Sequence, residues 1–83
     1  MNLLERLAEL EHNQWMSWTK EVIELNRNSE ITNILHEQWS PSWIPYSELT
    51  EGQKELDRVH ARKVMNLLNE FYKEKILEYM NIK

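Results

Sequence analysis

The sequence predicts a small all-α domain of two long helices and a short one, joined by an aromatic loop that contains proline. Three observations carry this prediction. Apolar residues repeat at helical spacing in two long segments, residues 2–28 and 51–80. The interior of the first segment has neither glycine nor proline, and the only glycine, Gly52, lies at the start of the second. Both prolines, Pro41 and Pro45, fall between the segments, where they exclude a regular helix.

The first helix is expected to run from about Asn2, which can cap it, to about Asn26. Residues 26–29 have the composition of a turn. Ser29 can then cap a short helix over residues 30–38.

The second long helix is expected to begin at residues 50–53, where Thr-Glu-Gly-Gln has the spacing of a capping box. Residues 47–49 can form a single helical turn before it. The helix can continue to Met80, and Asn66 and Asn69 are the positions at which it would break instead. We expect the proline-bearing loop to pack across the helix pair.

Size, composition and charge exclude several classes of protein. Eighty-three residues make one domain, residues 1–83, with one modest core. The net charge of -4 argues against binding to extended nucleic acid. There is no cysteine, hence no disulfide framework and no thiolate metal site. No apolar run reaches the ~18–20 residues that span a bilayer, and the amino terminus lacks a signal-peptide pattern, so we expect no membrane insertion and a cytoplasmic location.

Two carboxylates lie within the apolar stripes of the long helices. Glu11 falls on the stripe of the first helix, and Asp57 falls on the stripe of the second. Because a buried carboxylate is costly unless it is paired or hydrogen-bonded, we expect both to be mostly buried in a polar cluster. Their partners would be a tryptophan indole N–H, backbone N–H groups of residues 43–47, or Arg58. Catalysis by the two carboxylates is the alternative.

The aromatic and basic residues offer further candidates for ligand contact. Trp15 and Trp18 lie on the first stripe, which favours a place in the core, whereas for the loop residue Trp43 core packing and ligand contact are equally open. Arg58 and Arg62 share one edge of the second helix and suit a phosphate group. Pairing with the acidic residues of the same edge, Glu51 and Glu55, is the alternative for these arginines.

No pattern in the chain indicates a metal centre or a nucleophile. His12 lies at the edge of the first stripe, and a structural or ligand-contacting role is favoured for it over metal binding, because the histidines are not closely spaced. The chain has no glycine-rich phosphate loop and no nucleophile elbow. We therefore expect no catalytic residues, no metal and no cofactor.

Three segments in succession resemble the ryanodine-receptor repeat domain. Residues 7–15 (LAELEHNQW) carry a histidine followed three positions later by tryptophan, residues 41–49 (PSWIPYSEL) contain the x-Pro-Tyr-x-x-Leu turn, and residues 54–58 (KELDR) form an acidic helix with Asp-Arg. The resemblance spans about residues 4–68. It departs in the middle, where residues 21–38 replace the Gly-Trp-x-x-Gly stretch typical of the channel repeats.

The resemblance implies a helical module that binds an adenine nucleotide and lacks catalytic parts. In this interpretation aromatic residues stack the base, basic residues hold the phosphates, and the remaining polar residues contact ribose hydroxyls or orient the arginines. The candidate ligand-binding residues are Trp15, Trp43 and Tyr46 for the base, Lys20, Arg58 and Arg62 for the phosphates, and Glu11, His12 and Asp57 for the ribose or for orienting the arginines. Trp18 is a further candidate for ligand contact, without an assigned part of the ligand.

Stand-alone versions of this domain in bacteria and bacteriophages suggest, by analogy, one use for such a module. In the host cytoplasm it would act as an anti-defence sponge that sequesters an immune nucleotide signal, such as a cyclic ADP-ribose isomer or a cyclic oligonucleotide. The alternatives are a protein-interaction module that uses the tryptophan loop and a nucleotide-processing enzyme that uses Glu11, His12 and Asp57.

The second long helix also predicts assembly. From Glu51 to Met80 it would be ~45 Å long, which is more than the first helix can cover. Apolar residues continue beyond Asn69: Phe71, Tyr72, Ile76, Leu77, Tyr79 and Met80. We therefore expect a homo-oligomer, most simply a dimer, through residues after Asn69. A break near Asn66–Asn69 that folds the helix back is the alternative.

Overall fold

The structure, a computed structural model, describes residues 1–82, and Lys83 lies outside the described residues. The described residues form three α-helices, α1 (Leu3–Leu25), α2 (Glu30–Trp39) and α3 (Glu51–Ile82). Two short 3-10 helices, η1 (Ser40–Ser42) and η2 (Tyr46–Glu48), lie in the loop between α2 and α3. The predicted all-α class is confirmed, and the predicted helix ends lie within two residues of the observed ones.

The helix starts show which of the predicted caps form. The side-chain oxygen of Asn2 accepts a hydrogen bond from the Glu5 N–H at 2.9 Å. The capping box of α3 forms in both directions, because the Gln53 N–H donates to Thr50 Oγ1 at 3.2 Å and the Thr50 N–H donates to Gln53 Oε1 at 3.1 Å. Ser29 occupies the N-cap position of α2, but its side chain makes no capping hydrogen bond.

This difference between the two caps gives a testable prediction. Thr50→Ala is expected to lower the free energy of unfolding by about 1 kcal/mol, because it removes the side-chain acceptor of the Gln53 N–H. Ser29→Ala is the matched control and should leave the free energy of unfolding nearly unchanged. Urea denaturation followed by circular dichroism measures both. Equal losses in the two variants would contradict the assignment of Thr50 as the cap.

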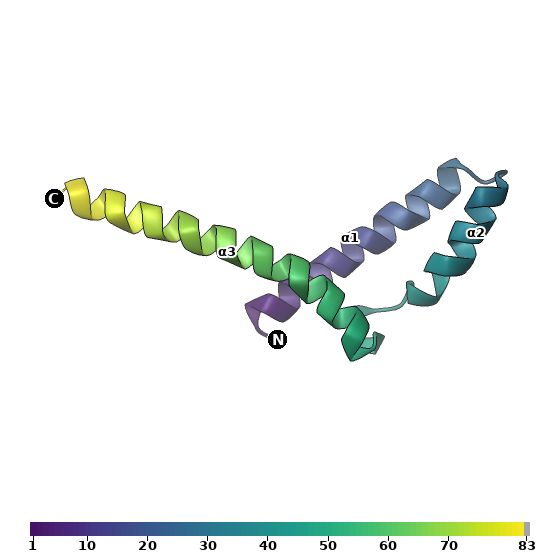
Figure 1. Ribbon diagram of the computed structural model, residues 1–83, viewed down its shortest axis with the longest axis horizontal. Coiled ribbons are helices and arrows are strands. Elements are labelled where there is room, and N and C mark those ends of the chain that lie inside the picture. Colours follow the sequence, from purple (N-terminus) through teal and green to yellow (C-terminus); the bar gives the residue numbers. More distant parts are fainter. Residues whose placement is uncertain (83) are drawn as a thin grey trace.

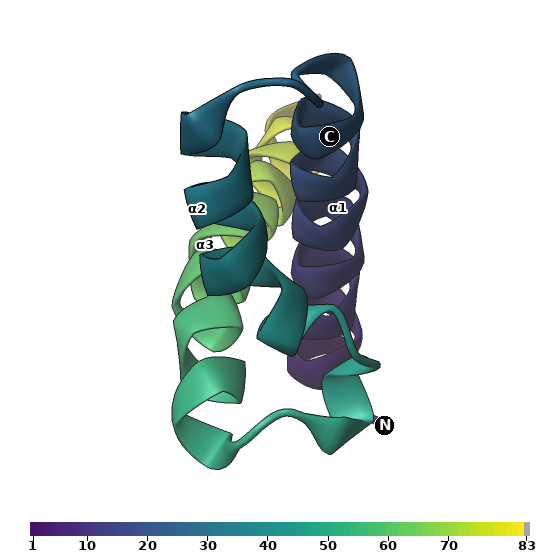
Figure 2. The ribbon, with the colours of Figure 1, turned by 90° about the vertical axis from the view of Figure 1, so that its right-hand side faces the viewer.

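The core lies where α1 and α3 cross, and the loop closes it from one side (Figure 1). Its buried apolar members are two alanines and two loop residues: Ala8, Tyr46, Leu49 and Ala61. The alanines have no side chain beyond Cβ, which lets two helix backbones approach closely. Seen end-on, α2 returns beside α1, and the loop then passes from the end of α2 to the start of α3 (Figure 2). The prediction that the loop packs across the helix pair is confirmed.

Helix α3 is continuous through Asn66 and Asn69, so the predicted alternative of a break and a fold-back is wrong. Only the first part of α3 packs on the rest of the chain, and every side chain from Asn66 to Asn81 is exposed. The molecule measures 63 × 26 × 14 Å, with a radius of gyration of 18.1 Å. A compact chain of this length would have a radius of gyration of about 12 Å. None of the described helices is long and apolar enough to cross a bilayer.

Candidate functional site

Three polar side chains of α1 hold the loop in place. Glu5, His12 and Thr19 are spaced by seven residues, so they lie on one edge of the helix, about two turns apart. Each of them makes a hydrogen bond to a different residue of the loop segment 43–46. We call these three residues the polar ladder. The ladder fixes the loop along α1, and the loop in turn forms one side of the candidate site.

His12 is the middle residue of the ladder. It is 3% exposed, and its Nε2 lies 2.6 Å from the Ile44 carbonyl oxygen. Because a carbonyl only accepts, Nε2 must carry the hydrogen of this bond. The other ring nitrogen, Nδ1, lies 3.8 Å from Asp57 Oδ2 on α3. The ring therefore links the loop, α1 and α3.

Thr19 is the upper residue of the ladder and is 0% exposed. Its oxygen accepts a hydrogen bond from the Trp43 indole N–H at 2.9 Å. Its own hydroxyl donates to the Trp15 carbonyl at 2.8 Å. The Trp43 ring is thus fixed by its polar end, which satisfies the one donor that a buried indole carries.

Glu5, the lower residue of the ladder, connects the loop to α3. It accepts a hydrogen bond from the Tyr46 hydroxyl at 2.8 Å, and the Arg58 guanidinium contacts it at 2.5 and 3.3 Å. The hydrogen bond from Arg58 lowers the pKa of the Glu5 carboxyl. Burial raises the pKa of Tyr46 to about 12, and the facing Glu5 carboxylate adds to this rise.

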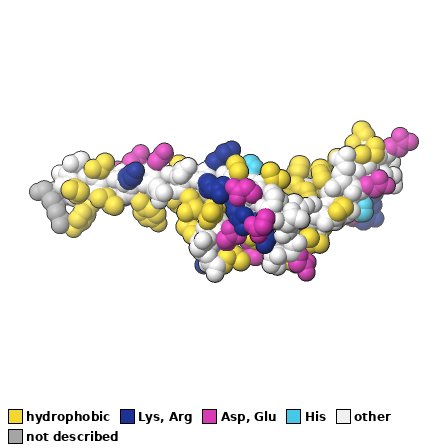
Figure 3. Space-filling view, turned by 60° about the horizontal axis from the view of Figure 1, so that its bottom comes forward, with side chains coloured by type: hydrophobic (Ala, Val, Ile, Leu, Met, Phe, Trp, Pro, Cys, Tyr) yellow, Lys and Arg dark blue, Asp and Glu magenta, His cyan; other side chains and the backbone are white. Residues whose placement is uncertain are grey.

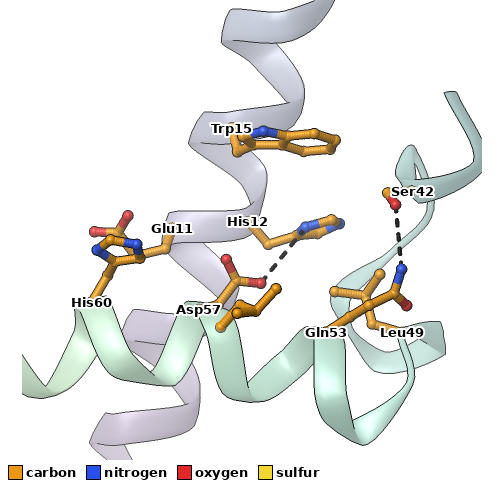
Figure 4. A pocket seen from close by; sticks show the side chains of 9 residues that line it. Glu11, His12, Trp15, Ser42, Leu49, Gln53, Asp57 and His60 are labelled. Atoms are coloured by element: carbon orange, nitrogen blue, oxygen red, sulfur yellow. Dashed lines mark hydrogen bonds and ion pairs between the residues drawn. The ribbon is translucent and has the colours of Figure 1, made fainter. Parts of the chain in front are cut away.

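A pocket of about 390 Å³ lies beside the ladder, between α1 and the start of α3. Figure 4 shows Trp15 at one end, Asp57 and His12 at the base, and Glu11 with His60 at the far side. The other lining residues come from the loop and from α3: Ser42, Leu49, Gln53 and Leu56. The Gln53 side-chain amide donates to Ser42 Oγ at 3.3 Å and closes the side opposite Glu11.

The lining combines a flat aromatic surface with hydrogen-bond acceptors. The Trp15 and His12 rings lie nearly parallel, with centroids 6.0 Å apart and planes inclined by 19°. Burial raises the pKa of the Asp57 carboxyl, the facing His12 opposes this rise, and the charge of Glu11 reinforces it. Among the residues that the structure describes, no lysine or arginine lines the pocket. The pocket therefore suits a ring whose edge carries hydrogen-bond donors better than it suits a phosphate group.

The prediction that Glu11 and Asp57 are mostly buried and hydrogen-bonded is wrong only in its second part. The Asp57 side chain is 19% exposed, and Glu11 is also partly buried. Within residues 1–81, however, neither side chain makes a hydrogen bond, and Asp57 only faces His12 Nδ1 at 3.8 Å. The reason is that the polar ladder takes the partners expected for them: Thr19 accepts the indole N–H, and Glu5 pairs with Arg58. The two carboxylates are left at the open side of the helix crossing, where they line the pocket.

The arginines lie on a different side of α3 from the pocket. Arg58 contacts three acids, Glu5, Glu51 and Glu55, and its side chain is 17% exposed. Arg62 pairs with Glu55 at 2.6 Å. The predicted alternative, pairing with acids of the same edge, is confirmed for both arginines. Figure 3 shows basic and acidic side chains interleaved over this part of the molecule.

Four other predicted contacts also lie outside the pocket lining. Trp18 is 56% exposed and packs against Trp39, with ring centroids 5.8 Å apart, so the prediction of a core position is wrong for it. Lys20 Nζ lies 5.6 Å from the centre of the Trp43 ring. Trp43 and Tyr46 are held by the ladder. The pocket brings together four of the ten candidates: Glu11, His12, Trp15 and Asp57.

Sequence reasoning missed the outer two residues of the ladder, Glu5 and Thr19. The signal for them is the seven-residue spacing with His12, which places one polar residue per two turns beside the apolar stripe. It also missed His60 and Gln53 in the pocket lining. Within the part of the chain that the structure describes, no three His, Cys, Asp or Glu residues are grouped to hold a metal ion. No protein-family model, curated protein or solved structure matches this chain.

Proposed function

We propose that this protein is a non-catalytic binding module for a nucleoside-containing ligand, held by its base and sugar and not by its phosphates. The observation that carries the proposal is the pocket between α1 and α3, in which Trp15 stands beside two carboxylates, Glu11 and Asp57. Its volume of about 390 Å³ lies within the range of small-molecule sites. The resemblance to the ryanodine-receptor repeat supports the same class of ligand.

Each part of a nucleoside has a counterpart in the lining. A base can stack on the Trp15 ring where it lines the pocket, and such stacking contributes ~1–3 kcal/mol per base in known complexes. Ribose hydroxyls and exocyclic amines are donors, and the carboxylates of Asp57 and Glu11 are acceptors. Asp57 has no hydrogen-bond donor of its own within residues 1–81, so a ligand donor would satisfy it. Phosphates would project from the open side toward solvent.

The geometry of His12 supports binding without catalysis. A general base needs a nitrogen lone pair directed at the substrate. The Nε2 of His12 is committed to the Ile44 carbonyl and the Nδ1 faces Asp57 at 3.8 Å, so the ring is oriented by contacts within the fold. A module that binds and does not convert a nucleotide fits the role of a sponge for an immune signal, a use that rests on the family resemblance.

The protein-interaction alternative through the tryptophan loop has weaker support. Trp43 is tied to Thr19 by its indole N–H, and its ring lies at 5.3 Å from the His36 ring. Trp39 is half-buried between Trp15 and Trp18. Trp43 in the loop and Trp39 at the end of α2 therefore both serve contacts within the chain.

Calorimetric titration tests the proposal with adenosine, ADP-ribose, cyclic ADP-ribose, ATP and a cyclic dinucleotide, and with inorganic pyrophosphate as the phosphate-only probe. We expect binding by at least one nucleoside-containing ligand and none by pyrophosphate. Trp15→Ala should weaken that binding at least tenfold, since it removes the stacking surface. Trp18→Ala removes an exposed tryptophan outside the pocket and is the matched control.

A second variant separates loss of binding from loss of fold. Asp57→Asn preserves shape and removes the charge, so it should weaken binding while the circular dichroism spectrum is unchanged. Ligand recovered intact after denaturation of the complex would agree with a binding module, and converted ligand would identify an enzyme. The proposal would be overturned if none of the nucleoside-containing ligands bound, or if the Trp15→Ala variant bound as tightly as the parent protein.

A further inference from the structure

The chain exposes more surface than a compact protein of its mass. Its accessible surface is 6701 Å² for 10.2 kDa. The scaling for folded monomers gives about 5,300 Å², which leaves a surplus on the order of 1,400 Å². A stable interface buries about 800 Å² per partner. The surplus is thus large enough to supply one interface.

Much of the surplus surface is apolar and lies on the projecting part of α3. Six residues follow one stripe at helical spacing: Ala61, Met65, Leu68, Tyr72, Ile76 and Tyr79. We call this set the α3 stripe. Its exposed fraction rises from 0% at Ala61 through 37% at Leu68 to 61% at Tyr72 and 59% at Ile76. The stripe is therefore the outward continuation of the surface that α1 covers at the crossing.

Two more apolar side chains border the stripe on the same side, Val64 at 37% and Phe71 at 50% exposure. Figure 3 shows hydrophobic side chains gathered along this projecting half of the helix. A helix in a protein is stabilised mainly by packing of its apolar face against another element. Among the described residues, the projecting part of α3 has no such element to pack against. A contiguous apolar face of this kind is typical of an association surface.

The charges of the chain are complementary between its two ends. Residues 1–60 hold five Lys or Arg and eleven Asp or Glu, whereas residues 61–83 hold five Lys or Arg and three Asp or Glu. The body is thus acidic and the α3 extension is basic. Two copies attract each other when the extension of each lies toward the body of the other.

We propose that a second copy of this chain covers the α3 stripe, with the two α3 helices antiparallel about a two-fold axis near Tyr72. Because α1 already covers Ala61, the part of the stripe available to a second copy runs from Met65 to Tyr79, and Tyr72 is its middle. The antiparallel arrangement brings each basic extension toward the acidic body of the other copy. It also aligns the helix dipoles favourably. The pairing does not depend on the ligand proposed above.

Sedimentation velocity over a concentration series tests the association on the full chain. The parent should sediment as a dimer at tens of micromolar. Tyr72→Glu, at the axis, should shift it to a monomer, whereas Asn66→Glu adds the same charge on another face of the exposed helix and should leave the dimer intact. Circular dichroism checks that both variants fold. A monomeric parent, or equal loss of dimer in both variants, would overturn the proposal.

Disulfide cross-linking tests the orientation, without background because the chain has no cysteine. In the antiparallel arrangement Leu68 of one copy faces Ile76 of the other. Two copies of Leu68 are then about 12 Å apart along the helix, beyond the ~7 Å that a disulfide spans. Oxidation of a mixture of the Leu68→Cys and Ile76→Cys proteins should therefore give a cross-linked dimer, and neither protein should cross-link alone. A cross-link in the Leu68→Cys protein alone, or none in the mixture, would contradict the arrangement.

Discussion

Tyr46→Ala is expected to lower the free energy of unfolding by about 3–5 kcal/mol, the largest loss that any single substitution in this chain should cause. Tyr46 is 3% exposed and belongs to the core cluster with Ala8, Leu49 and Ala61. It is the largest side chain of that cluster, so its removal leaves a cavity and also frees Glu5 from one of its donors. Small domains have stabilities of about 5 kcal/mol, so the variant should be largely unfolded near room temperature.

Tyr46→Phe is the matched control, because it keeps the ring and removes only the hydroxyl. Loss of the hydrogen bond to the Glu5 carboxylate should cost about 1.5–3 kcal/mol. Urea denaturation gives both values. If the two variants lost the same stability, the contribution of Tyr46 would lie in its hydroxyl and not in its packing, contrary to the expectation.

Glu5→Gln is expected to make the stability of the protein less sensitive to acid. The hydrogen bond from Arg58 lowers the pKa of Glu5 in the folded state from its ordinary 4.5. A carboxyl with a lowered pKa contributes stability above its unfolded pKa, and this contribution is lost as the pH falls through its folded pKa. The parent should therefore be more stable than the Glu5→Gln protein at neutral pH. This difference in stability should become smaller as the pH falls below 4.5.

The gap between parent and variant is the quantity to measure, by thermal denaturation from pH 7 downward. The pKa of Glu55 is also lowered, by its hydrogen bond to Arg62, so the acid sensitivity of either protein alone has more than one source. Glu21→Gln removes an exposed carboxylate of the same helix and should give a profile parallel to that of the parent. A constant gap between the parent and the Glu5→Gln protein at all pH values would contradict the prediction.

The secondary structure was predictable because its determinants are local. The capping box at Thr50 and Gln53 acts over three residues. The prolines at 41 and 45 exclude a regular α-helix through the loop, whatever the tertiary structure around it. Periodicity likewise placed Glu11, Trp15 and Asp57 on the facing sides of the two long helices, and these three residues do line the pocket.

The partners of the polar residues were not predictable, because they depend on the crossing of α1 and α3 and on the path of the loop. Arg58 is one residue from Asp57 in sequence but about 100° away around the helix, which places it on Glu5 and outside the pocket. In the sequence, Glu5 and Thr19 look like ordinary polar residues on a helix edge. Their roles become visible only in the structure, where the loop runs along that edge and bonds to both. Only the tertiary structure distinguishes a carboxylate that is paired from one that is left open.

A rotation of the unbroken α3 helix at its crossing with α1 would be amplified along its length. Its pivot is the crossing at Ala61, and Met80 lies about 28 Å farther along the axis. A rotation of about 10° at the pivot would move the far end by about 5 Å, on the order of one helical turn. The pocket lies at this pivot, and it is lined by Asp57 and His60 of α3 and by Glu11 and Trp15 of α1. A molecule that wedges the two helices apart there would thus be sensed at the opposite end of the chain.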